Sequence, residues 1–331
     1  MNNVLQSTLG RLRLDNPQKH KNLVIIPLFD EAPTVFDYLS LKKALEQELA
    51  TITEISEGGS VPDLKVTNKS DTPILLIDGE ELIGAKQNRI VNTSILLAAK
   101  SETLIPVSCT ESGRWGYNSD SFRSSMSMMN ASARASKSER VKMQRSSMNS
   151  YGAGQSEVWG DVAKLQSSLG TSSPSNAMSD SYEQKAMDVN EYLTAFPLLD
   201  HQKGMMAFVN GTPVFADFIS KSDAYADVHS KLVKSIAIEC LALPEILAPT
   251  DLNNLKIEGW KWLNNLSYTQ EVPLNAPIGM GTDAHYESAT QGASALFYNE
   301  TLIHLSVFNK IPSQQEQEGA LGDSFRRRRQ F

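Results

Sequence analysis

Short apolar runs that follow one another through brief polar turns constrain the fold of this chain most strongly. The clearest pair, residues 205–209 and 213–216, flanks Asn210-Gly211, and Asn-Gly supplies the positive backbone angles that a tight turn between antiparallel strands requires. Three more runs follow the same plan: residues 282–289, 293–298 and 301–308. Strands that succeed one another without regular helical crossovers indicate an α+β fold with mainly antiparallel sheets.

Helical periodicity appears between these runs. Apolar residues recur at helical spacing in residues 38–49, 158–169, 182–193 and 222–241, and each stripe predicts a helix that packs one face against the sheets. With 331 residues, of which 40% are hydrophobic, the chain can bury one substantial core. We expect a single domain over residues 21–311, preceded by an N-terminal arm at 1–20 and followed by a disordered tail at 312–331.

A change of composition at Tyr117 predicts an insertion over about residues 117–180. Its first part, up to Ser150, is rich in Ser and Met, and its basic residues outnumber its acidic ones. Such a segment buries little apolar surface to offset the entropy of ordering, so we expect it to be mobile or loosely helical. The alternative is a basic lid that closes over an anionic ligand.

Charge and cysteine content exclude several classes of protein. A formal net charge of −7 argues against general nucleic-acid binding, which depends on basic contacts to phosphate. Cys109 and Cys240 are too few for a disulfide framework, and residues 1–20 lack an apolar signal core, so a reducing cytoplasm fits best. No apolar run approaches the ~20 residues that span a bilayer.

A dense polar stretch interrupts the apolar runs between residues 78 and 115. Runs at 74–77, 95–97 and 104–107 predict strands, and neighbouring strands would bring the polar residues at their ends together. The candidates for one shared site are Asp78, Glu80, Glu81, Lys86, Gln87, Asn88, Arg89, Asn92, Glu111, Arg114 and Trp115. Taken singly, each of these is more typical of a solvated turn held by salt bridges; taken together, they favour a ligand-binding site.

Two motifs in this stretch resemble a known family. Residues 78–89, DGEELIGAKQNR, and residues 105–115, IPVSCTESGRW, are similar to the signature of the ARG and rhodanese-phosphatase-superfamily-associated protein domain. The similarity extends over about residues 20–310. The family is named for its genomic association with ADP-ribosylglycohydrolases and rhodanese-type phosphatases, so the resemblance implies a role in ADP-ribose or nucleotide metabolism rather than a particular reaction.

The carboxylates are the best catalytic candidates. Glu80, Glu81 and Glu111 could activate a water molecule. Asp78, Glu80 and Glu81 could instead hold a divalent cation such as magnesium. Lys86, Arg89 and Arg114 would then neutralise phosphate oxygens. That arrangement suits hydrolysis of a nucleotide-like phosphoester or of an ADP-ribosyl bond.

The same residues would also make a binding pocket without catalysis. Gln87, Asn88 and Asn92 could contact ribose or base edges, the arginines could bind phosphate, and Trp115 could stack on a ring. We therefore expect recognition of a small anionic ligand of the ADP-ribose or nucleotide type, with hydrolysis if a carboxylate activates water. The alternatives are a non-catalytic ligand-sensing module and a partner-binding or structural protein.

Cys109 allows two interpretations. As a nucleophile it would use Arg114 to favour the thiolate and His285 or His304 as a base. However, Cys109 alternates with Val107 and Ile105, which places it on a buried strand face. We favour the structural interpretation, and no common catalytic or phosphate-loop motif is present.

Overall fold

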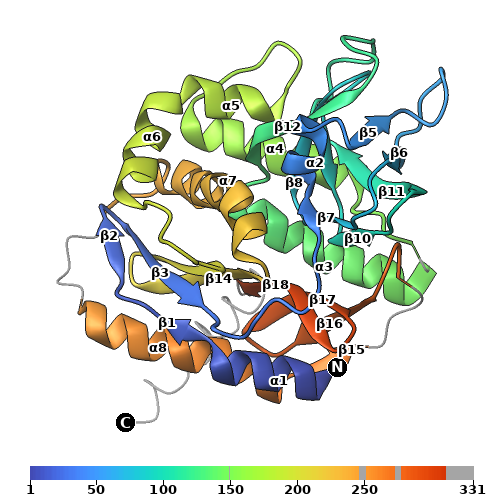
Figure 1. The fold of residues 1–331 in the computed structure, drawn as a ribbon. Helices are drawn as coiled ribbons and strands as arrows, with labels where there is room; N and C mark the ends of the chain where they lie inside the picture. The colour runs from blue at the N-terminus through green and yellow to red at the C-terminus, as the bar shows by residue number, and fades with distance from the viewer. Residues whose placement is uncertain (149, 246–250, 273–276, 311–331) are drawn as a thin grey trace, which may run out of the picture.

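A nine-stranded sheet forms the larger half of the fold (Figure 1). The structure is a computed structural model, and it describes all residues except 149, 246–250, 273–276 and 311–331. The strand order is β1-β3-β13-β14-β18-β17-β16-β15, with β2 also paired to β3, and all of these pairings are antiparallel. Its strands are β1 (Arg13–Leu14), β2 (Gln18–His20), β3 (Leu23–Phe29), β13 (Gly204–Val209), β14 (Thr212–Ile219), β15 (Gln270–Val272), β16 (Thr282–Glu287), β17 (Gln291–Tyr298) and β18 (Thr301–Asn309).

The tight turn predicted at Asn210-Gly211 is confirmed, and a second tight turn joins the runs at residues 293–298 and 301–308. Asn210 and Gly211 join β13 to β14 with φ of 49° and 82°. Asn299 and Glu300 join β17 to β18 with φ of 46° and 57°. Two successive positive φ angles twist the chain in the sense that matches the flanking strands, so these turns fix the register of the two hairpins.

Helices cover both faces of the large sheet. On one face, Val24 and Ile26 of β3 pack with Leu5 of α1 (Asn2–Arg11) and Leu255 of α8 (Leu252–Asn265). The alternate residues of β3 point to the other face, where five further helices lie (Figure 1). These are α3 (Ala131–Met148), α4 (Gln155–Leu169), α5 (Met178–Gln184), α6 (Ala186–Ala195) and α7 (Ser222–Cys240). Residues 1–20, predicted as an arm, are thus part of the packed body.

A second, smaller set of strands carries the polar stretch. A six-stranded sheet has the order β12-β8-β9-β11-β6-β5, and a three-stranded sheet has the order β10-β7-β4. The elements are β4 (Leu39–Ser40), α2 (Leu41–Glu46), β5 (Ala50–Thr53), β6 (Asp63–Asn68), β7 (Ile74–Leu76), β8 (Glu80–Gly84), β9 (Arg89–Val91), β10 (Ile95–Leu97), β11 (Ser101–Cys109) and β12 (Phe122–Met128). The predicted α+β class with mainly antiparallel sheets is confirmed.

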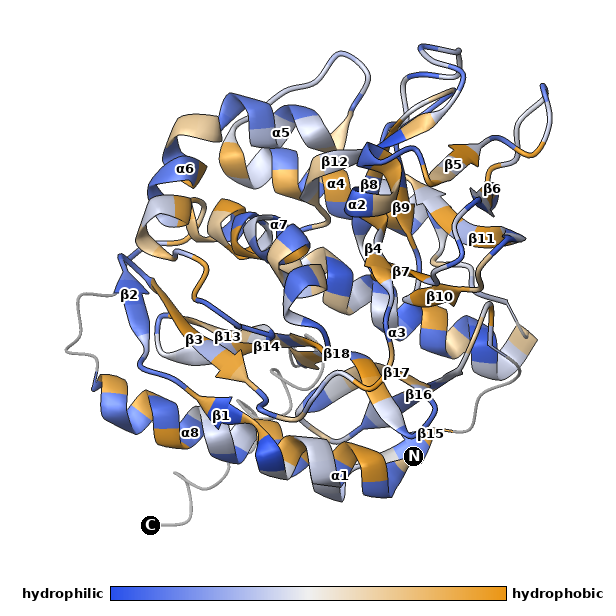
Figure 2. Ribbon diagram, in the orientation of Figure 1, coloured by the Kyte–Doolittle hydropathy of each residue, from blue (hydrophilic) through white to orange (hydrophobic). Residues whose placement is uncertain are grey.

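The expectation that residues 117–150 bury little is wrong. β12 pairs with β8, and α3 lies between the large sheet and the smaller strands (Figure 1). Figure 2 shows hydrophilic residues along α3, yet Arg134, Lys137 and Arg145 on this helix are fully buried. The prediction counted apolar burial alone, whereas ion pairs also hold this segment: Arg134 with Asp217, Lys137 with Asp78, and Arg145 with Asp283.

Two further expectations concern the C-terminal tail and membrane-spanning segments. The tail predicted to be disordered, residues 312–331, lies outside the described residues. Among the helices that the structure describes, none is long and apolar enough to cross a membrane.

Candidate functional site

The turn between β8 and β9, residues 85–88, brings the two halves of the polar stretch together. The Asn88 backbone N–H donates to the Glu111 carboxylate at 3.2 Å. Arg114 donates to the Asn88 side-chain oxygen at 3.1 Å and to the Ala85 carbonyl at 2.7 Å. Asp78 and Gly79 form a separate turn between β7 and β8, closed by the Glu80 backbone N–H, which donates to the Ile77 carbonyl at 3.2 Å. The hairpin that joins β8 to β9 turns at residues 85–88.

Asp78 and Glu80 do not share this site. They face the helices behind β8, where lysines reach them from distant parts of the sequence. Lys137 of α3 contacts the Asp78 carboxylate, and Lys231 of α7 donates to the Glu80 carboxylate at 2.8 Å. All four side chains are buried. Charged groups in protein interiors are ordinarily paired, so this arrangement is that of a structural ion-pair network.

Glu81 points to different partners. Its fully buried carboxylate accepts hydrogen bonds from Thr110 at 3.2 Å, Ser125 at 2.9 Å and Ser127 at 3.1 Å. Burial raises the pKa of Glu81 to about 7, and the three hydroxyl groups offset only part of that shift. Glu81 therefore changes its charge near neutral pH inside the protein.

The metal site expected at Asp78, Glu80 and Glu81 stays a prediction. Their carboxylates are bound by separate partners, and the described part of the chain contains no group of three or more His, Cys, Asp or Glu side chains placed to hold a metal ion. Asn92 is also in the interior, where it donates to the Tyr151 carbonyl at 3.0 Å and accepts from Ser108 at 2.9 Å.

Arg89 is the centre of a second group of side chains, which we call the Arg89 cluster: Glu54, Lys86, Gln87, Arg89, Cys109 and Trp115. The fully buried guanidinium of Arg89 donates to Gln87 at 3.2 Å and contacts the Cys109 sulfur. It also lies 5.6 Å from the centre of the Trp115 ring. Four of these residues, Lys86, Gln87, Arg89 and Trp115, were predicted to bind ligand.

Lys86 lies between two exposed aromatic rings. Its ammonium group is 5.4 Å from the centre of the Trp115 ring and 5.0 Å from that of Tyr117. Trp115 is 50% exposed and Tyr117 is 53% exposed. A cation over ring faces is a favourable contact, and here it keeps two large rings at the surface beside a positive charge.

Glu54 is the member of the cluster that sequence reasoning missed. Its side chain is only 3% exposed and its Oε1 lies 3.6 Å from Arg89 Nη2. Neither carboxylate oxygen has a hydrogen-bond partner among the described residues. Alternation after the buried Ala50 and Ile52 of β5 is the signal that could have located Glu54, because every second residue of a strand points to the same face.

The loop between β5 and β6 closes over this cluster. Lys86 donates to the Gly58 carbonyl at 2.9 Å, and Arg89 donates to the Ser60 carbonyl at 3.3 Å. Gly59 has a φ of 78°, and a Cβ atom there would lie 3.0 Å from Lys86 and 3.3 Å from Trp115. A residue without a side chain thus lets the loop approach the cluster closely.

Glu111 is held by Arg114 in a two-point contact. Arg114 Nε donates to Glu111 Oε1 at 2.9 Å, and Arg114 Nη2 donates to Oε2 at 2.6 Å. Burial opposes ionisation of Glu111, but hydrogen bonds from Arg114, Ser175 and the Asn88 backbone outweigh it and lower its pKa. The carboxylate is therefore charged and already paired.

Cys109 has the environment of a structural residue. It is buried, and burial raises the pKa of its thiol although the charge of Arg89 opposes that shift. The candidate bases lie in the large sheet. The His304 ring is hydrogen-bonded to Ser94 and Asp217. Burial lowers the pKa of His285 to about 3.

Comparison with known families gives one result for nearly the whole chain. The model of the ARG and Rhodanese-Phosphatase-superfamily-associated Protein domain matches residues 11–308. No curated protein and no solved structure matches the chain. The matched range begins within α1 and ends within β18, so it includes both the Arg89 cluster and the buried ion pairs.

Proposed function

We propose that this chain, which belongs to the ARG and Rhodanese-Phosphatase-superfamily-associated Protein domain family, binds an ADP-ribose-like or nucleotide-derived anion at the Arg89 cluster. The ligand class comes from the family resemblance. We infer the location of the binding site from Lys86, whose ammonium group lies between the exposed rings of Trp115 and Tyr117. Rings of this kind can stack on a base while a neighbouring cation binds phosphate.

Trp115→Ala is expected to weaken ADP-ribose binding by about 1–3 kcal/mol, the usual loss when a stacking ring is removed. Isothermal titration of the wild type and the variant with ADP-ribose, adenosine and inorganic phosphate measures the loss and separates the ring contribution from the charge contribution. Trp260→Ala is the matched control, because Trp260 is 52% exposed on α8. Equal affinities in the two variants would exclude Trp115 from the site.

Hydrolysis is the second candidate function, and Glu54 is the observation that favours it. Its two buried carboxylate oxygens have no hydrogen-bond partner within the described residues, and Oε1 lies 3.6 Å from Arg89 Nη2. We infer that a water molecule enclosed there would be held and deprotonated by Glu54. The sequence proposed three other carboxylates as catalytic. In the structure Glu80 pairs with Lys231, Glu81 accepts hydrogen bonds from hydroxyl groups, and Glu111 pairs with Arg114.

Glu54→Gln is expected to abolish hydrolysis of an ADP-ribosylated substrate while ADP-ribose still binds, because the amide keeps the shape of the side chain but cannot take a proton. Turnover is measured by release of ADP-ribose, with and without magnesium, which also tests the proposed divalent cation. Glu111→Gln serves as the comparison carboxylate. A wild-type protein that binds ADP-ribose without turnover would be a ligand-sensing module, and full activity in Glu54→Gln would remove Glu54 from the mechanism.

A cytoplasmic location is part of the same proposal. Cys109 and Cys240 are both free and buried, as is usual for thiols in a reducing compartment. The partner that we propose is a small anionic ligand rather than nucleic acid or a membrane, since the chain carries a net charge of −7.

A further inference from the structure

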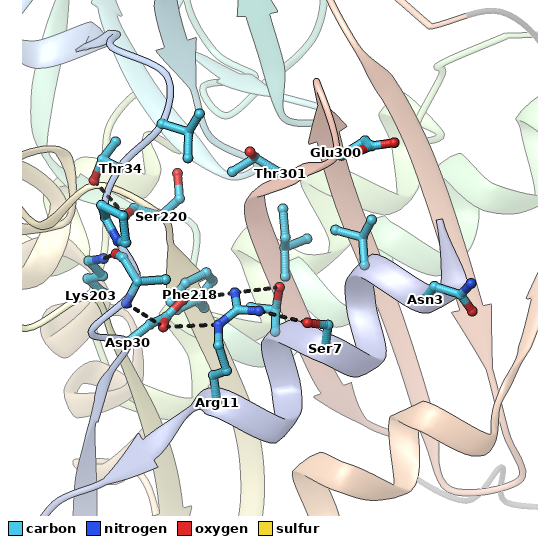
Figure 3. Close-up of a pocket in the computed structure, with 16 residues that line it drawn as sticks. Asn3, Ser7, Arg11, Asp30, Thr34, Lys203, Phe218, Ser220, Glu300 and Thr301 are labelled. Atoms are coloured by element: carbon cyan, nitrogen blue, oxygen red, sulfur yellow. Dashed lines mark hydrogen bonds and ion pairs between the residues drawn. The ribbon is translucent and has the colours of Figure 1, made fainter.

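A cavity of about 580 Å³ lies between α1, the segment after β3 and the β17–β18 hairpin (Figure 3). Its size is within the range of about 300–1,000 Å³ that is common for small-molecule sites. None of its lining residues belongs to the Arg89 cluster. The polar groups that enclose it come from five separate segments and include Arg11, Asp30, Lys203 and Ser220 (Figure 3).

Lys203 is a buried cation with unused hydrogen-bonding capacity. Its side chain lines the cavity although the residue is only 8% exposed. Its ammonium group donates to the Ala32 carbonyl at 3.0 Å, its one hydrogen bond within the described chain. An ammonium group has three donors. Burial lowers the pKa of Lys203, and the charge of Asp30 opposes that shift, so an additional anion would stabilise the charged form.

Arg11 lies beside the same cavity and contacts three of its lining residues. It donates to Ser7 at 2.8 Å and to Thr8 at 3.4 Å, and its Nη2 lies 3.3 Å from Asp30 Oδ2. Asp30 also accepts the Ala32 backbone N–H at 3.0 Å. The Asp30 carboxylate pairs with Arg11, and its charge also acts on Lys203, so two cations and one carboxylate lie at this end.

The rest of the lining gives the cavity two ends of different character. Glu300 lies across the cavity from Lys203 (Figure 3), and it is exposed at the rim. Val4, Val35 and Leu302 supply apolar surface along the lining. A negative group is therefore favoured beside Lys203 and disfavoured near Glu300, while the apolar residues favour a carbon chain.

We propose that this cavity binds a small organic anion, with its oxyanion on Lys203 and Arg11 and a short apolar body against Val4, Val35 and Leu302. The shared chemistry is a carboxylate or a phosphate monoester. The two sources differ in shape and charge, so they can be distinguished by titration. The site is independent of the ligand proposed for the Arg89 cluster, because no side chain belongs to both.

Calorimetric titration with two series, the carboxylates from acetate to hexanoate and the monoalkyl phosphates of equal chain length, tests this site. In the better-bound series the affinity should rise roughly fourfold for each methylene group that is buried. Lys203→Met keeps the aliphatic stem and removes the charge, and it should reduce the affinity at least tenfold. Lys100 is exposed and does not line the cavity. Lys100→Met is therefore the matched control and should bind the anion as the wild type does.

A second variant keeps the test decisive if Lys203→Met fails to fold. Val35 is exposed at the mouth of the cavity, so Val35→Glu should leave folding intact and repel the anion, lowering its affinity several-fold. Unchanged binding in both Trp115→Ala and Trp260→Ala is expected, which separates this site from the Arg89 cluster. Absence of saturable binding by both series, or equal affinity in the wild type and Val35→Glu, would overturn the proposal.

Discussion

Arg134→Met is expected to lower the free energy of unfolding by about 3–5 kcal/mol, the usual loss when one member of a buried ion pair is removed. Arg134 donates two hydrogen bonds of 3.0 Å to Asp217, and both side chains are fully buried. Burial opposes ionisation of Asp217, but the charge of Arg134 and the hydrogen bond from His304 outweigh it and lower the pKa. Ser306 donates a further hydrogen bond to this carboxylate at 2.8 Å. Methionine would fill part of the space but leave that carboxylate without its main counter-charge.

Urea unfolding at neutral pH, followed by circular dichroism, measures this loss. Arg123→Met is the control, because Arg123 is exposed on β12 and surface substitutions ordinarily change stability by no more than about 0.5 kcal/mol. The double variant Arg134→Met, Asp217→Asn should lose less than the sum of its two single variants, because neither charge then remains unpaired. Strict additivity would show that the pair does not act as a unit.

Glu81→Gln is expected to raise the free energy of unfolding at pH 8 by up to roughly 3 kcal/mol and to change it little at pH 5. The folded protein holds the Glu81 proton up to a pKa of about 7, whereas the ordinary value is 4.5. Between these two values the unfolded chain releases a proton that the folded chain keeps, so stability falls as the pH rises through this window. One pKa unit corresponds to ~1.4 kcal/mol, which sets the size of the effect.

The amide introduced by Glu81→Gln resembles the protonated acid in shape and in hydrogen bonding, so the substitution removes this pH dependence without leaving a cavity. The difference between wild type and variant, measured by urea unfolding at several pH values from mildly acidic to mildly basic, isolates Glu81 from other titrating groups. Glu102→Gln provides a matched exposed carboxylate. Parallel stability curves for wild type and Glu81→Gln over this range would mean that Glu81 does not carry the perturbed pKa.

Local signals in the sequence predicted the parts of the fold that depend on local chemistry. Asn210-Gly211 located a hairpin because its backbone angles are set by those two residues. The continuous apolar sequence of β3 is typical of a strand covered on both faces, because its alternate residues meet different layers. Helix α7 was predicted from apolar residues at helical spacing, and these residues form its buried face.

Long-range pairings could not be predicted from the sequence. Lys137 follows Asp78 by 59 positions, and Lys231 follows Glu80 by 151. Without these partners, the carboxylates of residues 78–81 have the composition of a metal or catalytic site. With them, Asp78 and Glu80 belong to the packed interior, and the polar residues of the Arg89 cluster remain beside Trp115 and Tyr117. Glu54 directly follows β5, which is linked through β6 and β11 to β9, the strand that begins with Arg89. Composition does not reveal this order of strands.

Helix α3 has a consequence for how this family can diverge. Its three buried cations pair with acidic residues on both halves of the fold: Arg134 with Asp217 of β14, Lys137 with Asp78 ahead of β8, and Arg145 with Asp283 of β16. A substitution at one end of such a pair leaves a buried charge, so the first change is penalised until the second occurs. Among family members, we therefore expect these positions to vary jointly, two at a time, as correlated pairs that an alignment of diverse sequences would display.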